Sequence, residues 1–178
     1  MFVAAHLGLA PWDVFHQGVS RHTGISLGWA IEITGVVLLL LWIPLRQRPG
    51  VGTILNALEI GLVVNLIGDH LPSTDRLIPR LAYVVGAVVV IAAGSGLYIG
   101  AGLGTGPRDG IMVGLAARGF SVRVTRTALE VVVMAVGIAL GGHIGIGTLA
   151  FVVGIGPLVH VLIPRLALRP LVAMEPVT

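Results

Sequence analysis

Five long apolar segments constrain the fold of this chain more than any other feature of its sequence. A helix needs about 20 residues to cross the roughly 30 Å hydrocarbon core of a bilayer. With 56% hydrophobic and only 11% charged residues, against about 25% charged in a soluble domain, the chain lacks the polar surface of a water-soluble enzyme, a nucleic-acid-binding module or a disordered tail. The predicted spans are Leu27–Leu45, Gly52–Leu71, Leu81–Leu103, Val124–Leu140 and Ile144–Ile163.

Two further segments, Pro11–Arg21 and Pro107–Arg118, have helical character but are too short to cross a bilayer. The predicted fold class is therefore all-α: a polytopic helical membrane protein with about five spans and two short helices. We expect residues 1–178 to form a single transmembrane domain.

Arginine is the only strong cation, and its distribution predicts the orientation of the chain. Cytoplasmic loops of membrane proteins are enriched in Lys and Arg, so the net charge of +3 and the pI near 10.6 indicate topology here and not a nucleic-acid partner. Eight arginines fall on the side of the loop after Leu27–Leu45, and three fall on the other side. This bias predicts a multi-pass membrane protein with a cytoplasmic C-terminus. The eight are Arg46, Arg48, Arg108, Arg118, Arg123, Arg126, Arg165 and Arg169; the three are Arg21, Arg76 and Arg80.

The chain also matches itself at a shift of 95 or 96 residues. This predicts a first repeat over residues 1–72, a second over 81–164 and a tail over 165–178. An odd number of spans in each unit makes the two copies face opposite ways, which is the inverted-topology repeat of many secondary transporters. The matching residues are Gly8, Pro11 and Asp13 with Gly104, Pro107 and Asp109, and Gly50, Gly52 and Thr53 with Gly145, Gly147 and Thr148.

The first repeat lacks its leading span, because Met1–Gly8 corresponds only to the last turns of Leu81–Leu103. Two interpretations stay open. In the first, which we favour, the start codon was placed too late or the chain is trimmed. In the second, the protein works with five spans.

Each Pro-x-Asp motif is built like the start of a helix. Glycines such as Gly104 and Gly106 let the backbone turn, Pro107 suits the first helical turn, and Asp109 meets the positive helix end. In the structural interpretation, the motif interrupts one helix and then starts a capped short helix. In the functional interpretation, the free N–H groups bind an anionic or polar group, with Arg108 beside them. Gly-x-Gly is not a dinucleotide fingerprint here, since no βαβ unit surrounds it.

Polar residues inside the predicted spans are the other candidates, because a carboxylate at the centre of a lipid-facing helix costs about 2.5–3.5 kcal/mol. Glu59 either lines a cavity and carries protons or is a buried, hydrogen-bonded group. Glu130 follows Arg126 by four residues, which predicts a local ion pair. His160 takes the repeat position of Asn65, and we expect it to make a helix contact and not to bind metal. The predicted substrate-binding residues are Asp13, Glu59, Asn65, Arg108, Asp109 and His160.

Two glycine rows have the four-residue spacing that lets helices pack closely in a membrane. We expect these rows to pack inside the chain, and a homodimer contact is the alternative. The rows are Gly96, Gly100 and Gly104, and Gly137, Gly141 and Gly145.

Several motifs resemble bacterial integral membrane proteins of the YczE/YyaS/YitT type over nearly the whole chain. The resemblance implies a location in the bacterial cytoplasmic (inner) membrane and a fold type, but no substrate and no catalytic residue. It carries a loose association with export-like or maturation-supporting roles. Similar proteins have another span before Gly8. The motifs are Gly8-Leu9-Ala10-Pro11-Trp12-Asp13, Trp42-Ile43-Pro44-Leu45-Arg46-Gln47-Arg48-Pro49-Gly50, Gly100-Ala101-Gly102-Leu103-Gly104, Gly106-Pro107-Arg108-Asp109-Gly110 and Gly156-Pro157-Leu158-Val159.

The sequence predicts a small transporter or exporter-like protein with a small-molecule or ion substrate. The alternative is a non-transporting scaffold or accessory factor for a partner protein or a biosynthetic pathway. We do not expect an enzyme, because the chain has no cysteine, no HExxH motif and no Ser/His pair with clear spacing. The expected partner is the lipid bilayer; we expect no cofactor, no metal and no nucleic acid.

Overall fold

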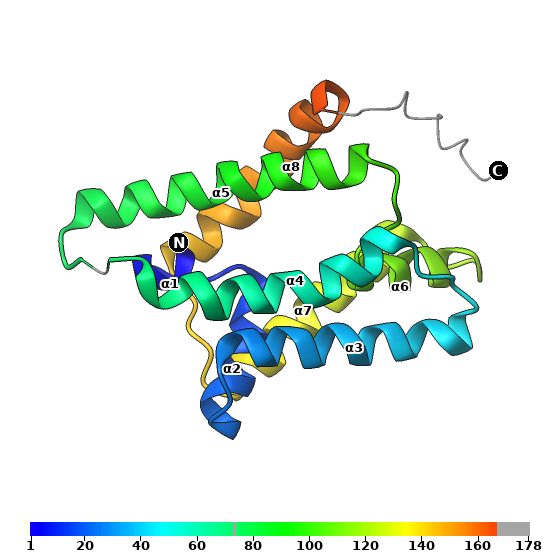
Figure 1. Ribbon diagram of the computed structural model, residues 1–178, viewed down its shortest axis with the longest axis horizontal. Helices are drawn as coiled ribbons and strands as arrows, with labels where there is room; N and C mark the ends of the chain where they lie inside the picture. Colours follow the sequence, from blue (N-terminus) through cyan, green and yellow to red (C-terminus); the bar gives the residue numbers. More distant parts are fainter. Residues whose placement is uncertain (73, 167–178) are drawn as a thin grey trace.

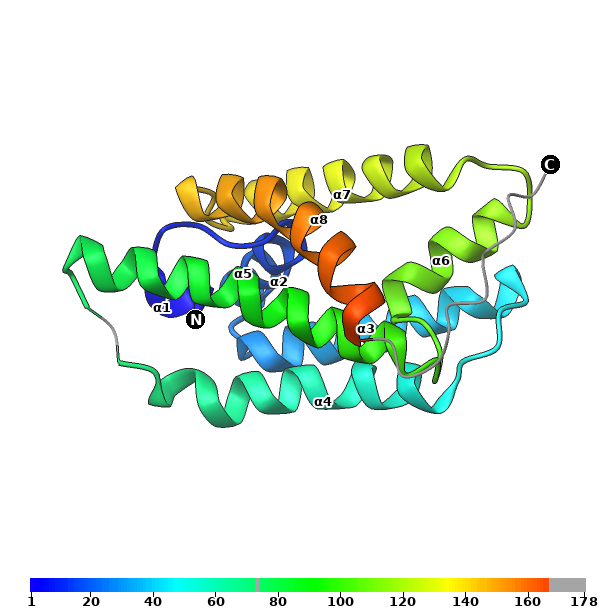
Figure 2. The same ribbon diagram turned by 90° about the horizontal axis from the view of Figure 1, so that it is seen from above.

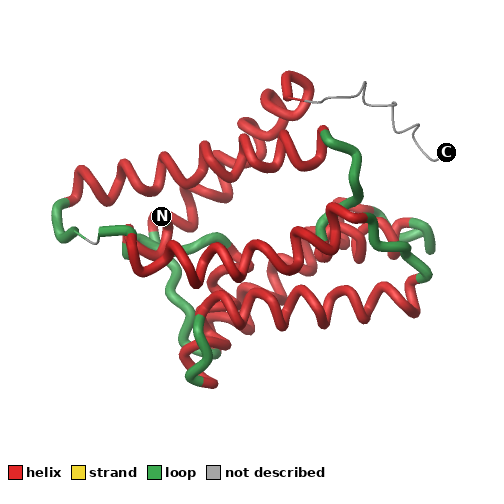
Figure 3. Tube along the Cα trace, in the orientation of Figure 1, coloured by secondary structure: helices red, strands yellow, loops and turns green. Residues whose placement is uncertain are grey.

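A computed structural model describes residues 1–72 and 74–166, and this part of the chain contains helices and no strands (Figure 3). The helices are α1 (Phe2–Ala5), α2 (Pro11–Thr23), α3 (Leu27–Leu45), α4 (Val51–Ile67), the 3₁₀ helix η1 (Gly68–His70), α5 (Leu77–Gly100), α6 (Pro107–Ala116), α7 (Val122–Ala139) and α8 (Ile146–Leu166). The all-helical prediction is confirmed. Beyond Leu166, the predicted tail lies outside the described residues.

Helices α3, α5 and α8 are long and apolar enough to cross a membrane. The other two predicted spans correspond to α4 and α7. Helix α4 is apolar but has 17 residues, and α7 carries Arg123, Arg126 and Glu130 within its 18 residues. The membrane character of the chain therefore rests on three helices, and the count of five spans stays a prediction.

Local sequence explains several helix boundaries. Helix α3 has the predicted bounds, and the hydroxyl of Ser26 accepts a hydrogen bond from the Trp29 N–H at its start. Helices α2 and α6 begin at Pro11 and Pro107, the positions where a missing N–H costs nothing. The Pro-x-Asp motifs therefore start two short helices, as predicted.

Several predicted boundaries differ from the helix ends, by four residues at the start of α5 and at the end of α4. Helix α5 begins at Leu77 and not at Leu81, so Arg80 lies inside the helix. Its guanidinium donates hydrogen bonds to the carbonyls of Ala5 at 2.6 Å and His6 at 2.7 Å, outside the helix. The span predicted to reach Leu71 ends as an α-helix four residues earlier and continues as η1.

Two pairs of long helices pack together, α5 with α8 and α3 with α4. Figure 1 shows α5 and α8 crossing on one side of the molecule, while α3 and α4 run along its long axis below them. Figure 2 shows α7 and α4 on opposite flanks, with α5 and α8 between them in that view. The short helices lie toward different ends of the long axis: α2 packs on α7 and α6 packs on α3.

The main core lies between α1, α2 and α5. Phe2, Leu9 and Val14 pack there against Val84 and Val88. Elsewhere, large apolar side chains face outward along the long helices: Ile43 is 70% and Ile78 81% exposed. Such a surface is stable only where lipid replaces water, in agreement with a membrane location.

Candidate functional site

The link between α1 and α2 is held against the start of α8. The carbonyl of Leu7 accepts the N–H of Gly147 at 2.7 Å. Gly8 has a φ of 107°, and a Cβ on it would lie 2.7 Å from the hydroxyl oxygen of Thr148. That hydroxyl accepts the N–H of Gly145 at 3.2 Å. The α1–α2 link in the first half thus packs against the first turn of α8.

The same contacts recur between the α5–α6 link and the start of α4. The carbonyl of Leu103 accepts the N–H of Gly52 at 3.0 Å. Gly104 has a φ of 120°, and a Cβ on it would lie 2.7 Å from the hydroxyl oxygen of Thr53. That hydroxyl accepts the N–H of Gly50 at 3.2 Å and donates to Thr105 O at 2.7 Å. The repeated glycine and threonine motifs meet each other across the two halves of the chain.

Each short helix packs closely on a long helix of the other half. A Cβ on Gly110 of α6 would overlap the ring of Trp42 on α3. The indole N–H of Trp42 donates to Pro107 O at 2.8 Å, which fixes the ring over the start of α6. On the other side, a Cβ on Gly137 of α7 would lie 2.6 Å from the backbone of Phe15 on α2. Glycine permits close approach at both contacts, once on the short helix and once on the long one.

An arginine near the end of each short helix contacts the end of that long helix. Arg21 donates to Gly141 O, just after α7, at 2.6 Å. Arg118 donates to the carbonyls of Pro44 and Leu45 at the end of α3. Guanidinium groups placed here interact favourably with the negative end of a helix. Arg21 and Arg118 therefore make the same kind of contact, each with backbone carbonyls at the end of the long helix on which its short helix packs.

Asp13 lies in the first turn of α2, close to a buried imidazole. Its carboxylate is 3.7 Å from Nδ1 of His16, and the His16 residue is 7% exposed. Within the described residues, His16 Nδ1 and Trp12 Nε1 are buried and have no hydrogen-bond partner. The start of α2 thus combines a partly exposed carboxylate with two buried donor or acceptor groups.

Asp109 lies at the start of α6, where polar groups from three helices converge. Its carboxylate is 3.7 Å from the guanidinium of Arg108, and both side chains are about two-fifths exposed, at 41% and 42%. A Cβ on Gly106 would lie 3.4 Å from the Asp109 carboxylate, 3.6 Å from the Asn56 side-chain oxygen and 3.7 Å from the Tyr98 hydroxyl. The three polar groups therefore lie around the position where Gly106 has no side chain, and the Tyr98 hydroxyl is buried there without a hydrogen-bond partner among the described residues.

The remaining candidates lie apart from both clusters. Asn65 accepts hydrogen bonds from the Ser26 hydroxyl at 2.8 Å and the Gly28 N–H at 3.1 Å, so it ties α4 to the start of α3. Glu59 is exposed on α4 and His160 is exposed on α8. The structure therefore does not gather the six predicted binding residues into one site.

The repeat relates Glu59 to Gly154. Gly154 faces Val88 of α5, with 3.4 Å between a Cβ placed on it and the valine side chain. On α8, the face at the position related to Glu59 is therefore covered by α5. On α4, the face that carries Glu59 itself is exposed.

Other local predictions can be compared directly. Arg126 and Glu130 form the predicted ion pair at 3.2 Å. The glycine rows pack within the chain at Gly96, against Leu162 and Leu166, and at Gly145, against Leu7. Among the described residues, no group of three or more metal-ligating side chains of the His, Cys, Asp and Glu type is brought together.

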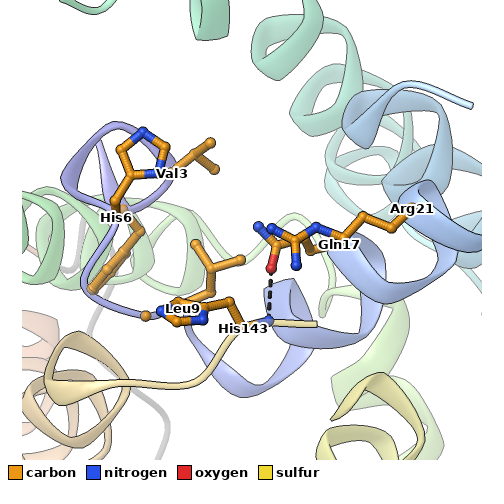
Figure 4. Close-up of a pocket in the computed structure, with 8 residues that line it drawn as sticks. Val3, His6, Leu9, Gln17, Arg21 and His143 are labelled. Carbon is orange, nitrogen blue, oxygen red and sulfur yellow. Dashed lines mark hydrogen bonds between the residues drawn. The ribbon is translucent and has the colours of Figure 1, made fainter. Parts of the chain in front are cut away.

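A pocket of about 290 Å³ opens at the end of the molecule where α7 ends and α8 begins. Figure 4 shows His6 and Val3 on one wall, and Gln17 and Arg21 of α2 across from them with His143. The side-chain oxygen of Gln17 accepts the backbone N–H of His143 at 2.7 Å, across 126 residues of sequence. The sequence analysis missed this pocket, because its polar groups come from three separate segments and form no motif.

The chain is similar to several bacterial proteins. It is 34% identical over 176 residues to an uncharacterized protein of Haemophilus influenzae, covering 98% of this chain and 81% of that protein. It is 30% identical over 161 residues to the uncharacterized membrane protein YczE of Bacillus subtilis, covering 89% and 75% of the two chains. It is 27% identical over 169 residues to the uncharacterized protein YyaS of the same organism, covering 91% and 83%.

No solved structure matches the chain. The resemblance to proteins of the YczE and YyaS type is confirmed by these relatives, one of which is described as a membrane protein. A family model described as a family of unknown function, DUF6198, matches residues 1–164. The chain therefore belongs to the DUF6198 family.

Proposed function

We propose that this protein is a small membrane transporter built from two inverted repeats. The observation that carries the proposal is the pair of reciprocal contacts in which Gly8 meets Thr148 and Gly104 meets Thr53. Inverted repeats that meet across a shared interface allow access to alternate between the two membrane faces, by rocking or gating of one repeat against the other.

The position of the short helices supports this proposal. Helix α2 lies beside the end of α7, and α6 lies beside the end of α3, toward opposite ends of the long axis (Figure 1). Asp13 and Asp109 lie in the first turns of these helices, so they lie toward different ends of the molecule. Left-handed glycines in both links, Gly8 and Gly104, supply backbone positions at which a change in φ and ψ is tolerated.

The inverted topology can be tested with single cysteines, because the chain has none of its own. Cysteines at the repeat-related positions Ser20 and Ala116 should react with a membrane-impermeant maleimide from opposite sides of the membrane. The comparison uses intact spheroplasts and inverted vesicles of the same cells. Labelling of both positions from the same side would contradict the inverted repeat.

Transport requires the two halves to move, so a cross-link between them should stop it. A Cβ on Gly52 would lie 3.0 Å from Cβ of Leu103, about 0.5 Å short of the Cβ–Cβ range of a disulfide, so the two cysteines can be bridged after a small shift that separates them. Vesicles containing the Gly52→Cys/Leu103→Cys variant are loaded with a panel of labelled carboxylate, phosphate and amine solutes. We expect protein-dependent release of at least one solute, loss of release on oxidation and recovery on reduction. The single Gly52→Cys variant is the control for oxidation without a cross-link.

A scaffold function is the alternative, and one observation favours it. The face of α4 that carries Glu59 is exposed, whereas α5 covers the related face of α8. An uncovered face of this kind suits a partner helix. If no solute is released, or if the cross-link leaves release unchanged, the transporter proposal fails and the scaffold becomes the better explanation.

A further inference from the structure

We propose that the pocket between α1, α2 and the α7–α8 loop binds an oxyanion, namely a phosphate or carboxylate group carried on a short apolar body. This proposal does not depend on transport, because the purified protein can bind an anion in this pocket whether or not it moves a solute across the membrane. The donors that line the pocket, their net charge and the apolar side chains beside them support this proposal.

Arg21 supplies a permanent positive charge in a fixed position. Its Nη1 donates to Gly141 O at 2.6 Å, which holds the guanidinium at the end of α7. A guanidinium carries five N–H donors in a planar fork that matches the two oxygens of a carboxylate or phosphate. Within the described residues, Gly141 is the one protein acceptor of this group, so further donors remain for a ligand.

Gln17 is oriented by the loop across the pocket. Its side-chain oxygen accepts the His143 N–H, so its amide NH₂ group is the end that can donate to a ligand. His6 and His143 line the same pocket and add two imidazole groups (Figure 4). The polar half of the pocket therefore offers donors from α2, the α1–α2 link and the α7–α8 loop.

The charge in the pocket is not balanced by a lining carboxylate. None of the residues that line it is Asp or Glu. The carboxylate of Asp13 lies on the same face of α2, one turn before Gln17, but its described ionic contact is His16 at 3.7 Å. A pocket with one fixed positive charge and no lining negative charge attracts anions and disfavours cations.

Apolar side chains complete the lining of this small pocket. They are Phe2, Val3 and Leu9, and Val3 lies on the same wall as His6 (Figure 4). The volume of about 290 Å³ is at the small end of the range for ligand pockets. The oxyanion can belong to a free solute or to the headgroup of an anionic lipid, and both present the same chemistry to Arg21.

Binding is measured on the purified full chain in a neutral detergent by calorimetric titration. The probes are inorganic phosphate, butyrate and dihexanoyl phosphatidylglycerol, with dihexanoyl phosphatidylcholine as the zwitterionic comparison. We expect saturable binding of at least one of the three anionic probes and at least tenfold weaker binding of phosphatidylcholine. Binding of phosphate or butyrate identifies a free anion as sufficient, and binding of phosphatidylglycerol alone identifies a lipid headgroup.

Two variants test the assignment of the pocket. Gln17→Glu keeps the oxygen that accepts the His143 N–H but adds a negative charge, so it should bind the anionic probe at least tenfold more weakly while keeping its melting temperature. Arg21→Gln should weaken binding to a similar extent. Arg118→Gln is the matched control, because Arg118 also donates to carbonyls at a helix end but does not line this pocket.

The proposal is overturned if none of the three anionic probes binds, or if phosphatidylcholine binds as tightly as the anions. It is also overturned if Gln17→Glu binds like the parent chain, or if Arg118→Gln loses binding as completely as Arg21→Gln. Failure of solute release in the cross-linking experiment leaves these binding measurements unaffected, so the two proposals fail separately.

Discussion

Gly8 packs so closely against Thr148 that a Cβ on residue 8 would lie 2.7 Å from the threonine hydroxyl oxygen. The two residues are separated by most of the chain, yet they join the first link to the first turn of the last helix. The same relationship joins Gly104 to Thr53. Four predictions follow from this and neighbouring contacts.

Gly8→Ala should lower the stability of the fold strongly. The substitution combines a φ of 107° with a steric overlap, and we expect a loss of about 2–4 kcal/mol from strained backbone and overpacking together. Gly24→Ala is the matched control, because Gly24 has a φ of 80° but no atom near its missing Cβ. It should cost only about 1 kcal/mol. Thermal unfolding in detergent measures both, and equal losses would show that the close packing of Gly8 against Gly145 and Thr148 is unimportant.

Thr53→Val should destabilise the chain although the two side chains have nearly the same shape. The Thr53 hydroxyl is fully buried and both donates to Thr105 O and accepts from the Gly50 N–H. Leaving these groups without partners costs about 1–3 kcal/mol. Thr34→Val is the control, since that hydroxyl only donates to the Ala30 carbonyl within its own helix. A melting temperature for Thr53→Val equal to that of Thr34→Val would refute this prediction.

Gly110→Ala should displace the ring of Trp42. A methyl group at residue 110 would overlap the ring, and overpacking of this kind costs about 1–3 kcal/mol. We expect a lower melting temperature and a change in tryptophan fluorescence. Gly94→Ala provides the opposite case: Gly94 lies in α5 with open space around it, so alanine should stabilise the helix by up to about 1 kcal/mol. An unchanged fluorescence spectrum in Gly110→Ala would contradict the contact.

Glu59→Leu should separate stability from function. The carboxylate is exposed on α4, and a charge at the centre of a span costs about 2.5–3.5 kcal/mol. The variant should therefore unfold at the same or a higher temperature than the parent chain. If Glu59 carries protons for transport, which is one of the two interpretations of the sequence, solute release is lost. Glu130→Leu is the control, because Glu130 pairs with Arg126 and its loss should leave release intact. Full release by Glu59→Leu would exclude a transport role for this residue.

Much of the secondary structure could be predicted because its causes are local. Leu27–Leu45 is bounded by the Ser26 cap and by Arg46, which has left-handed backbone dihedrals. Pro11 and Pro107 mark the first turns of the short helices through their own ring geometry. The start of α5 was missed because Arg80 resembles a loop residue until its acceptors, the carbonyls of Ala5 and His6, are known.

The candidate site was predicted less well, for a physical reason. Asp13 and Asp109 were found because each follows a proline in a repeated motif. Gln17 and His143 were missed, since their hydrogen bond joins segments 126 residues apart and neither residue belongs to a pattern. Asn65 was taken for a binding residue because a polar group in an apolar helix has no visible partner in the sequence. In the fold, it accepts hydrogen bonds from Ser26 and Gly28.

The sequence by itself determined that this chain is helical, that its solvent is largely lipid and that its glycine and threonine motifs occur twice. These properties follow from composition, helix propensity and spacing, which act over a few residues. Only the tertiary structure decided that the glycine motif of each half contacts the threonine motif of the other half, and that Arg21, Gln17 and His143 line one pocket. Such contacts depend on how whole helices pack, and packing is set by side chains that are neighbours in space and not in sequence.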